Sequence, residues 1–556
     1  MNQTYYDQEH ADIGWKKLPE ALQKLGYTEL RGPQKPCINT IFGGQDVFCV
    51  LATGGGKTAL AAIPTIVYDY QTIIFSPLIA LMKDQVDSLN RKGIRAGALN
   101  STQSDTENWH TLHAWLEKRC QVLFVAPERI GKPEFQAAMQ QAQLDLVVVD
   151  EAHTMSQWSV NFRPAYVQCG EFVKKYTPKQ VIALTATATQ DIIEDVMGIM
   201  GTTSMVLERH YEERSNLKLF GQYLDNERML LPEILNTVRQ VQGSVIVYCS
   251  TTKQVAEVTD YLAQAGEAVT FYHGQISDPT TKDMNQDTFM QNRARIMVAT
   301  NAFGMGIDKP DIEAIIHASP PGSIEAVAQE IGRAARDGRE AICRIFATPA
   351  GYWMQEYLWS MSNPPTATIY ATLRFVKGNM DANRELQMTG DAIGEILNDK
   401  AVPAALNYLV SLGCIERFAP SERVATITIQ DHDPASVSKA RTKLLDAIRQ
   451  YGIKETISGN NNEVYKVGLN YLKDKMGVTM TTIQNNLRQL NKDGVIAYEA
   501  PYNGKVSRFI RDISDMELVA AEARRRTERS KIDSVREYIK WPDHLKHQYL
   551  NDYFAL

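Results

Sequence analysis

The chain has 556 residues, which at roughly 150 residues per domain predicts three or four domains. Its net charge is −6, with 59 Lys and Arg against 65 Asp and Glu, and hydrophobic residues make up 44%. This globular composition excludes a disordered or fibrous chain, and no apolar run approaches the roughly 20 residues that a bilayer span needs. The mildly acidic balance also excludes a generally basic surface, so any nucleic-acid contact must be local.

The N-terminus and the cysteines indicate the cellular compartment. The first residues lack the basic start and apolar stretch of a secretion signal. Seven cysteines are scattered along the chain without a Cys-x-x-Cys pair, at positions 37, 49, 120, 169, 249, 343 and 414. This spacing argues against a disulfide framework and a zinc finger and favours a reducing compartment. We therefore expect a cytoplasmic protein without membrane contact.

Short apolar runs that alternate with helical patterns dominate the first part of the chain. Continuous apolar runs of this kind are typical of parallel strands that are buried on both faces. Five lie at 47–50, 72–75, 122–125, 146–149 and 181–184, and four more lie at 245–248, 268–272, 295–298 and 314–317. We therefore predict two consecutive α/β domains with parallel sheets, over residues 1–207 and 208–350.

The remainder of the chain is mainly helical and contains two stretches that look alike. Residues 390–415 and 471–496 each show a helix, a tight turn, a second helix, then Gly and a strand, which is the helix-turn-helix order. The second stretch continues into strand-like runs at 495–499 and 506–510 around Asn503-Gly504, a strong hairpin pattern. We predict a helix-turn-helix-like module over 351–430, a winged helix over 431–511 and a basic helical tail over 512–556, whose arginines could also form a solvated face.

A glycine-rich segment between the first buried strand and an apolar helix predicts a phosphate-binding loop. It consists of Thr53, Gly54, Gly55, Gly56, Lys57 and Thr58. Small residues let backbone N–H groups wrap phosphates at a helix N-terminus. Lys57 would reach the β- and γ-phosphates, and the Thr58 hydroxyl would ligate Mg²⁺. The strict pattern has Gly where Leu51 stands, and the alternative is a flexible turn.

Two acidic residues, Asp150 and Glu151, follow the buried run at 146–149 in the sequence Asp-Glu-Ala-His. The carboxyl end of a parallel strand near a phosphate loop is where Mg²⁺ and a water-activating base belong. We therefore assign Asp150 to the metal and Glu151 to the water. The alternative is that acidic residues follow strands simply because loops are polar, and the nearby phosphate loop argues against it.

A third segment, residues 329–338, carries Arg333 and Arg336, whose spacing predicts one shared helix face. Placed across a cleft from a bound nucleotide, these arginines would stabilise the negative charge that develops on the γ-phosphate, as an arginine finger does. An isolated arginine-rich helix is usually solvated surface, so this assignment depends on the other motifs.

These three segments, with residues 184–189 and 299–310, follow the order of the helicase motifs of superfamily 2. Over roughly residues 18–350 the sequence resembles the RecQ family of DNA helicases within that superfamily, with residues 150–153 as its DEAH box. Three features carry the likeness to RecQ. Residues 26–34 resemble the adenine-reading motif, residues 156–166 the aromatic-rich loop, and residues 76–82 with 125–129 the DNA-side motifs.

The resemblance implies an α/β fold of two tandem RecA-like parallel-sheet domains, followed by mainly helical winged-helix and helix-turn-helix modules. It places Tyr27 for stacking on adenine and Arg31 and Gln34 for reading the base. Further nucleotide-site positions that it implies are Gly306, Asp308 and the catalytic Gln329. Positions for DNA contact, or for coupling that contact to hydrolysis, are Ser76, Arg129, His153, Trp158, Phe162, Arg163 and Thr300, and the predicted recognition helix adds Arg488.

The chain also departs from the family. Gly32-Pro33 stands where the family usually has Pro-Gly, and Ala335 stands where it has Gly; both changes should be tolerated. Family members commonly carry a four-cysteine zinc site after the second sheet, but only Cys343 and Cys414 follow the arginine segment here. Such a site cannot form with cysteines, and we expect no structural zinc.

The predicted hairpin would hold Tyr502 at its tip, beside Asn503-Gly504. An aromatic ring there can stack on the terminal base pair and replace the stacking that is lost as the pair opens, which is worth about 1–3 kcal/mol per base. Some family members use a wing tyrosine in this way. The alternative is that Tyr502 is an exposed turn residue and Tyr498 packs beneath the wing.

Together the motifs and the resemblance imply an ATP-dependent DNA helicase that uses Mg²⁺. Hydrolysis of ATP would drive 3′-to-5′ translocation on single-stranded DNA and unwinding of duplex DNA, in DNA repair or recombination, with a nucleoid association if the protein is bacterial. One alternative is an RNA helicase with the same two ATPase domains, and another is a DNA-binding protein whose ATPase only switches its affinity for DNA. The winged helix favours DNA because a recognition helix fits the major groove of a DNA duplex, whereas that of RNA is too narrow.

Overall fold

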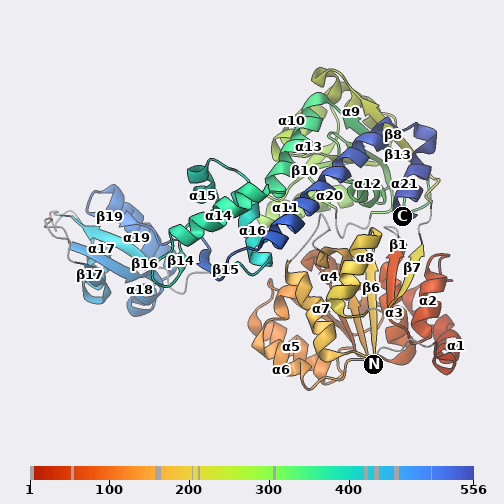
Figure 1. Ribbon diagram of the computed structural model, residues 1–556, viewed down its shortest axis with the longest axis horizontal. Helices are drawn as coiled ribbons and strands as arrows, with labels where there is room; N and C mark the ends of the chain where they lie inside the picture. Colours follow the sequence, from red (N-terminus) through yellow and green to blue (C-terminus); the bar gives the residue numbers. More distant parts are fainter. Residues whose placement is uncertain are drawn as a thin grey trace. The chain divides into compact units, whose positions relative to one another are not determined.

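The computed structural model of the chain describes residues 6–51, 55–156, 164–202, 204–210, 213–304, 309–418, 424–430, 437–455, 463–502 and 504–555 (Figure 1). These residues form two compact units. One comprises Met1–Trp359 with Arg526–Leu556, and the other comprises Ser360–Arg525. None of the helices in the described ranges is long and apolar enough to cross a membrane.

The first domain is built on a seven-stranded sheet in the order β3-β4-β2-β5-β6-β1-β7, and its pairings are parallel. The strands are β1 (Val47–Leu51), β2 (Thr72–Phe75), β3 (Ala96–Leu99), β4 (Val122–Val125), β5 (Leu146–Val149), β6 (Gln180–Thr185) and β7 (Val206–His210). The five predicted strands are confirmed, and each is buried along its whole length. The sequence does not predict the edge strands β3 and β7, because Ala-Gly and charged residues interrupt their apolar pattern.

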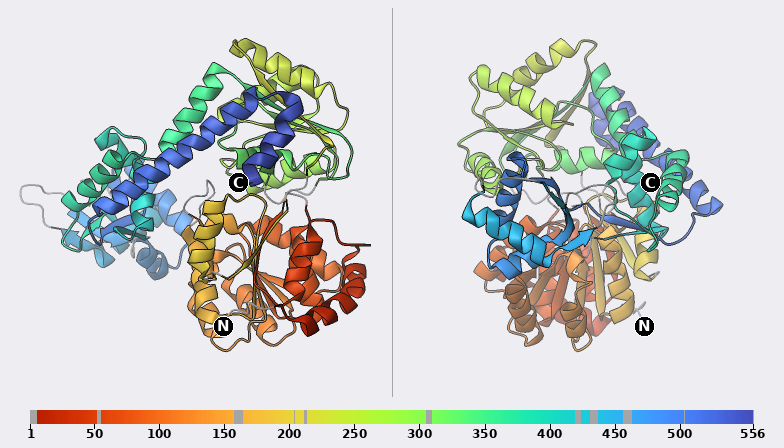
Figure 2. Two further views of the ribbon diagram at one scale, coloured as in Figure 1. Left: turned by 45° about the vertical axis from the view of Figure 1, so that its right-hand side comes forward. Right: turned by 90° about the vertical axis from the view of Figure 1, so that its left-hand side faces the viewer.

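Helices cover both faces of this sheet, which explains why its central strands are apolar throughout. On one face lie α1 (Gln8–Leu25), α2 (Gln34–Phe42), α3 (Lys57–Tyr68) and α4 (Ile79–Arg91). On the other lie α5 (Asp105–Leu116), α6 (Pro133–Met139), α7 (Pro164–Tyr176) and α8 (Gln190–Met200), with the short 3₁₀ turns η1 (Pro127–Arg129) and η2 (Ala152–Met155). Figure 2 shows these two helical layers. The carboxyl ends of β1 and β5 meet at one edge, where the phosphate loop and Asp150 follow.

The second domain has a six-stranded sheet in the order β10-β11-β9-β12-β13-β8, again with parallel pairings. Its strands are β8 (Leu217–Tyr223), β9 (Ser244–Tyr248), β10 (Val269–Tyr272), β11 (Ile296–Ala299), β12 (Ile312–His317) and β13 (Ala341–Ala347). One face is covered by α9 (Leu230–Val238), after the turn η3 (Glu227–Met229), and α10 (Thr252–Gln264); the other is covered by α11 (Pro279–Met290) and α12 (Ile324–Ile331). The prediction of two tandem RecA-like domains is confirmed.

The C-terminal segment packs on the face of the second sheet that α11 and α12 cover. It contains the end of α20 (Asp515–Lys540), the turn η5 (Asp543–Leu545) and α21 (Lys546–Ala555). The Lys546 side chain is fully buried. Its Nζ donates to the carbonyl oxygens of Tyr538 (2.6 Å), Ile539 (3.2 Å) and Trp541 (2.7 Å). Because carbonyls at a helix C-terminus lack intrahelical donors, this ammonium closes the turn between α20 and α21.

The unit Ser360–Arg525 contains two small modules, each with its own core, and it follows α13 (Pro349–Ser362), whose last residues it includes. The first module has α14 (Thr366–Gly378), α15 (Gly390–Leu397), α16 (Val402–Ser411), β14 (Glu385–Leu386), β15 (Ile415–Phe418) and β20 (Val506–Phe509). The second has β16 (Val424–Ile429), α17 (Lys439–Tyr451), β17 (Ile453–Glu455), β18 (Glu463–Gly468), α18 (Leu469–Met476), α19 (Met480–Lys492) and β19 (Ile496–Glu499). Both predicted helix-turn-helix pairs, α15–α16 and α18–α19, are confirmed.

The predicted hairpin over residues 495–510 is wrong. β19 pairs antiparallel with β16, whereas β20 pairs antiparallel with β14 and β15 in a different sheet. The reason is burial: Ile496 joins the core of the second module and Phe509 joins the core of the first. A turn sequence favours a local bend, but burying each strand in a separate apolar core outweighs that preference.

Tyr502 therefore does not lie at the tip of a hairpin. Its hydroxyl donates to the Lys505 carbonyl (3.0 Å) in the connection between the modules, and the neighbouring Asn503 lies outside the described residues. The second module is thus inserted into the first, between β15 and β20. The predicted ranges 351–430 and 431–511 do not follow these pairings, because β16 and β20 each pair with strands of the other range.

Candidate functional site

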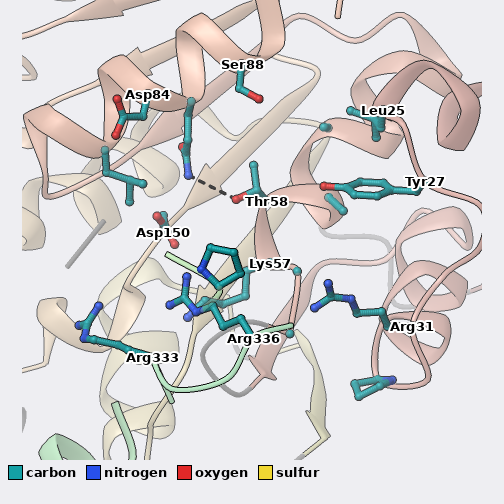
Figure 3. Close-up of a pocket in the computed structure, with 18 of the residues that line it drawn as sticks. Leu25, Tyr27, Arg31, Lys57, Thr58, Asp84, Ser88, Asp150, Arg333 and Arg336 are labelled. Carbon is teal, nitrogen blue, oxygen red and sulfur yellow. Dashed lines mark hydrogen bonds between the residues drawn. The ribbon is translucent and has the colours of Figure 1, made fainter. Parts of the chain in front are cut away.

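A cavity of about 940 Å³ in the unit Met1–Trp359 with Arg526–Leu556 is lined by residues from both RecA-like domains. Predicted site residues that line it are Tyr27, Arg31, Gly55, Gly56, Lys57, Thr58, Asp150, Glu151, Gln329, Arg333 and Arg336. Figure 3 shows Lys57, Thr58 and Asp150 between Tyr27 and Arg31 on one side and Arg333 on the other. The structure therefore brings together three motifs that lie far apart in the sequence.

The described part of the phosphate loop ends at Gly56, immediately before α3. Gly56 has a left-handed backbone, with φ of 80°, and no side chain caps the helix that follows. The Gln34 amide donates to the Gly56 carbonyl (3.1 Å) and accepts from the Arg31 N–H (2.8 Å). A Cβ atom at Gly56 would lie 2.2 Å from the Gln34 amide nitrogen and would displace that amide, and the left-handed backbone favours glycine as well. The N–H groups at the start of α3 are positioned to bind phosphate oxygens.

Gln34 occupies a different place from Tyr27 and Arg31. It is 5% exposed and does not belong to the described residues that line the cavity, because both ends of its amide are bonded within the protein. Tyr27 is 42% exposed, with the Lys92 ammonium 5.3 Å from its ring centre. A partly exposed aromatic ring suits stacking on a base. The base-reading roles of these residues stay predictions.

Glu151 lies opposite Lys57 at the end of β5, with Lys57 Nζ and Glu151 Oε1 3.6 Å apart. Its backbone is left-handed, with φ of 50°, which is uncommon for a residue with a side chain and typical of functional sites. The Asp150 carboxylate accepts from the Glu151 N–H (3.0 Å), and the Tyr166 hydroxyl donates to the Asp150 carbonyl (3.0 Å). Glu151 Oε2 accepts no hydrogen bond from the described residues.

The two carboxyl groups have opposite pKa shifts. Burial raises the pKa of Asp150 above its ordinary value, and the neighbouring charge of Glu151 raises it further. Burial also acts on Glu151, but nearby positive charge, above all that of Lys57, outweighs it and holds the Glu151 pKa below its ordinary value. Glu151 is therefore ionised near neutral pH, as a base must be.

His153 connects Glu151 to the adjacent strand. Its Nδ1 is in a hydrogen bond with Thr185 Oγ1 at the end of β6 (2.8 Å) and lies 3.3 Å from Glu151 Oε2. Burial lowers the pKa of the His153 imidazole and so favours its neutral form. The predicted coupling residue thus contacts both Glu151 and the strand end at Thr185.

Arg333 and Arg336 do not share a helix face as the spacing predicts. α12 ends at Ile331, and both arginines lie in the turn that follows, where Ala335 has a left-handed φ of 42°. The Ala335 N–H donates to the Ile312 carbonyl (2.9 Å), which draws the chain off the helix path. Arg333 is buried and donates to the Gly304 carbonyl. Both side chains still line the cavity, and Gln329 lines it from α12 itself.

Comparison with known proteins identifies the family. The DEAD/DEAH box helicase model matches residues 31–196, and the Helicase conserved C-terminal domain model matches residues 227–338. The ATP-dependent DNA helicase RecQ of Bacillus subtilis is 35% identical over 340 residues, which are 61% of this chain and 57% of that protein. The probable ATP-dependent DNA helicase RecS of the same organism is 34% identical over 364 residues, which are 65% of this chain and 73% of RecS. The chain belongs to the RecQ family of ATP-dependent DNA helicases.

The match to RecQ-family proteins covers only part of each protein: this chain spans 73% of RecS and 57% of RecQ. A solved structure of S. cerevisiae Dbp5 bound to RNA and ADP BeF3 aligns with a TM-score of 0.48 and 18% identity, over 61% of this chain and 90% of that chain. A likeness that distant says nothing about the substrate of the RecQ-family chain.

Two residues that the RecQ motifs assign to DNA are buried. Ser76 follows β2 and is 0% exposed. Arg129, in η1, is 9% exposed and lies 3.5 Å from Glu134 and 3.6 Å from Asp105. These positions suit residues that orient a DNA-binding loop at least as well as residues that touch DNA. Their role at the DNA stays a prediction.

The other DNA-side predictions divide into described and undescribed residues. Thr300 follows β11 and its N–H donates to the Tyr272 carbonyl (3.2 Å), and Arg488 is exposed on α19. Seven predicted positions lie outside the described residues: Thr53, Gly54, Trp158, Phe162, Arg163, Gly306 and Asp308.

The structure adds site residues that sequence reasoning missed in this RecQ-family chain. Gln85 on α4 lines the cavity and donates to the Thr58 hydroxyl (3.3 Å), the contact that Figure 3 marks with a dashed line. Arg214 and Asn216, in the segment between β7 and β8, also line the cavity. A single glutamine on a helix and two polar residues in a linker form no recognisable spacing pattern, so they could not be predicted from the sequence.

Proposed function

We propose that this chain hydrolyses Mg-ATP in the cavity and uses the energy to move 3′ to 5′ on single-stranded DNA and to separate duplex DNA. The observation that carries the proposal is the cavity itself, which joins the Lys57–Glu151 pair of one RecA-like domain to Arg333 and Arg336 of the other. A site divided between two domains lets hydrolysis and domain movement depend on each other.

The residues of the cavity suit phosphoryl transfer to water. Lys57 and the N–H groups at the start of α3 bind the phosphates, and ionised Glu151 accepts the proton of the attacking water. Arg336, from the other domain, stabilises charge on the departing phosphoryl group. The oxygen donors of Thr58 and Asp150 fit the preference of Mg²⁺, which would neutralise phosphate charge there.

DNA is favoured over RNA as the substrate. The printed names of the RecQ and RecS relatives are those of DNA helicases, and the helix-turn-helix of α18 and α19 suits a DNA major groove. We propose single-stranded and duplex DNA as partners, with Arg488 among the residues that hold duplex phosphates, and a role in DNA repair or recombination.

A strand-displacement assay tests the proposal. The full chain with Mg-ATP should release the strand from a 3′-tailed or forked duplex and leave a 5′-tailed duplex intact, and single-stranded DNA should stimulate its ATPase more than RNA does. Glu151→Gln serves as the inactive control. ATPase without displacement would support the alternative of an ATP-switched DNA-binding protein, and stronger stimulation by RNA would support an RNA helicase.

We further infer that no structural zinc holds the region after the second sheet. In support, Cys343 and Cys414 are buried in the cores of different units, and the buried Lys546 ammonium closes the α20–α21 turn with three hydrogen bonds. EDTA should therefore leave the thermal unfolding midpoint unchanged, because no metal contributes folding energy. Loss of ATPase in the same sample confirms that the chelator works. Stoichiometric zinc by elemental analysis would contradict the inference and would direct attention to His544 and His547.

A further inference from the structure

The segment between the two sheets holds the arginine-bearing turn by its backbone. The Arg214 guanidinium donates three hydrogen bonds to carbonyl oxygens just beyond α12. Nη1 donates to Gly332 (3.3 Å), and Nη2 donates to Ala334 (2.8 Å) and Ala335 (2.6 Å). These carbonyls flank Arg333 and directly precede Arg336. One side chain therefore contacts the backbone on both sides of one arginine and next to the other.

Asn216, two residues further on, holds the same turn at its far end. Its amide donates to the Ala335 carbonyl (3.3 Å) and to the Arg339 carbonyl (2.8 Å). Its own carbonyl accepts from the Ala341 N–H (3.0 Å), where β13 begins its pairing with β8. The turn is thus tied to the edge strand β8 and to the linker that leads into it.

The turn needs such support because it has no regular structure of its own. Carbonyl groups at the end of a helix have no intrahelical donors, and a positive charge there is favoured by the helix dipole. Ala335 has a left-handed backbone that residues with a Cβ atom rarely adopt, and it is 2% exposed. Without Arg214, the Gly332 and Ala334 carbonyls lose this donor beside a strained residue, whereas the Ala335 carbonyl keeps the Asn216 amide and the Gly338 N–H.

We propose that Arg214 is a positioning residue that fixes Arg333 and Arg336 in the geometry needed for ATP hydrolysis. The inference rests on the proposed function, because it gives these arginines the role described above. Arg214 lies in the linker from the first domain, so its hold on the turn ties the arginines to the path of the chain between the domains. Arg214 acts through backbone carbonyls, and its effect is on turnover rather than on ATP binding.

Steady-state ATPase with saturating single-stranded DNA tests this. Arg214→Ala should lower kcat about 10- to 100-fold, because a displacement of about 1 Å in a catalytic group has effects of that size. The KM for ATP should stay near the wild-type value. The kcat of Arg214→Lys should lie between that of the wild type and that of Arg214→Ala, since an ammonium reaches fewer carbonyls than a guanidinium. Asn216→Ala, which removes the weaker contacts, should lower kcat less and gives an independent reading if Arg214→Ala does not fold.

A double-mutant cycle separates positioning from general stability. If Arg214 acts through the arginines, Arg214→Ala should cause little further loss of kcat in an Arg336→Ala background. If the loss of kcat in the double variant equals the product of the two single losses, the two residues act independently and the proposal is overturned. Arg239→Ala is the matched control, because Arg239 also donates to a carbonyl after a helix, that of Ala265 after α10 (3.0 Å), away from the cavity. It should leave kcat unchanged.

The remaining outcomes distinguish this inference from the proposed function. A raised KM for ATP with unchanged kcat in Arg214→Ala would make Arg214 a nucleotide contact and overturn the positioning role. Wild-type kcat in Arg214→Ala, with a slow Arg336→Ala, would overturn the positioning role alone. Wild-type turnover in Arg336→Ala would overturn the proposed role of the arginine turn itself.

Discussion

Arg336→Ala should bind ATP almost as the wild type does but hydrolyse it at least about a thousandfold more slowly. The residue lines the cavity from the domain opposite the phosphate loop, so we expect it to add positive charge where the transition state develops negative charge. ATP binding by equilibrium titration and turnover in the presence of single-stranded DNA measure the two effects separately.

Two arginines that lie three residues away, one on either side, provide a control and a comparison for this substitution. Arg339→Ala removes an exposed guanidinium that is paired with Asp337 and Glu313, and it should leave turnover unchanged. Arg333 is buried and bonded to the Gly304 carbonyl, so its loss should disturb the turn more than the chemistry. A larger fall in turnover for Arg333→Ala than for Arg336→Ala would reverse this assignment.

Glu151→Gln should retain ATP binding and lose turnover by about two to four orders of magnitude, because the amide cannot accept the proton of the attacking water. In the proposed site, Asp150 is still present to hold the metal and Lys57 to hold the phosphates. Lys57→Ala should instead lose nucleotide binding. Binding of a fluorescent ATP analogue and single-turnover hydrolysis distinguish the two variants. Wild-type hydrolysis by Glu151→Gln would refute the assignment of the base.

The central strands and the catalytic edge were predictable from the sequence because their causes are local. A strand buried on both faces must be largely apolar, as β1, β4 and β5 are. The polar residues at the ends of parallel strands then meet at one edge, which places Lys57 near Asp150 and Glu151. Edge strands such as β7 have one open side and a mixed sequence, so no pattern reveals them.

The structural predictions that proved wrong concern segments whose conformation depends on contacts with distant parts of the chain. The spacing of Arg333 and Arg336 fits a helix, but the bond from Ala335 to the Ile312 carbonyl and the contacts of Arg214 favour a turn. The Asn503-Gly504 pair fits a hairpin, but the strands on either side are drawn into separate cores. Local propensity is decisive only where tertiary contacts do not compete with it.

The insertion of one small module into the other makes the inserted part separable. β15 and β20 pair with Phe418 opposite Val506, so the chain leaves the first module and returns to it at adjacent points of one sheet. Paired residues in antiparallel strands have Cα atoms about 5 Å apart, a gap that a two-residue turn closes. The segment between these residues could be replaced by such a turn, and every strand of the remaining sheet would keep its partner. In evolutionary terms, the same junction allows a helicase to exchange one accessory module for another without rebuilding the part that holds it.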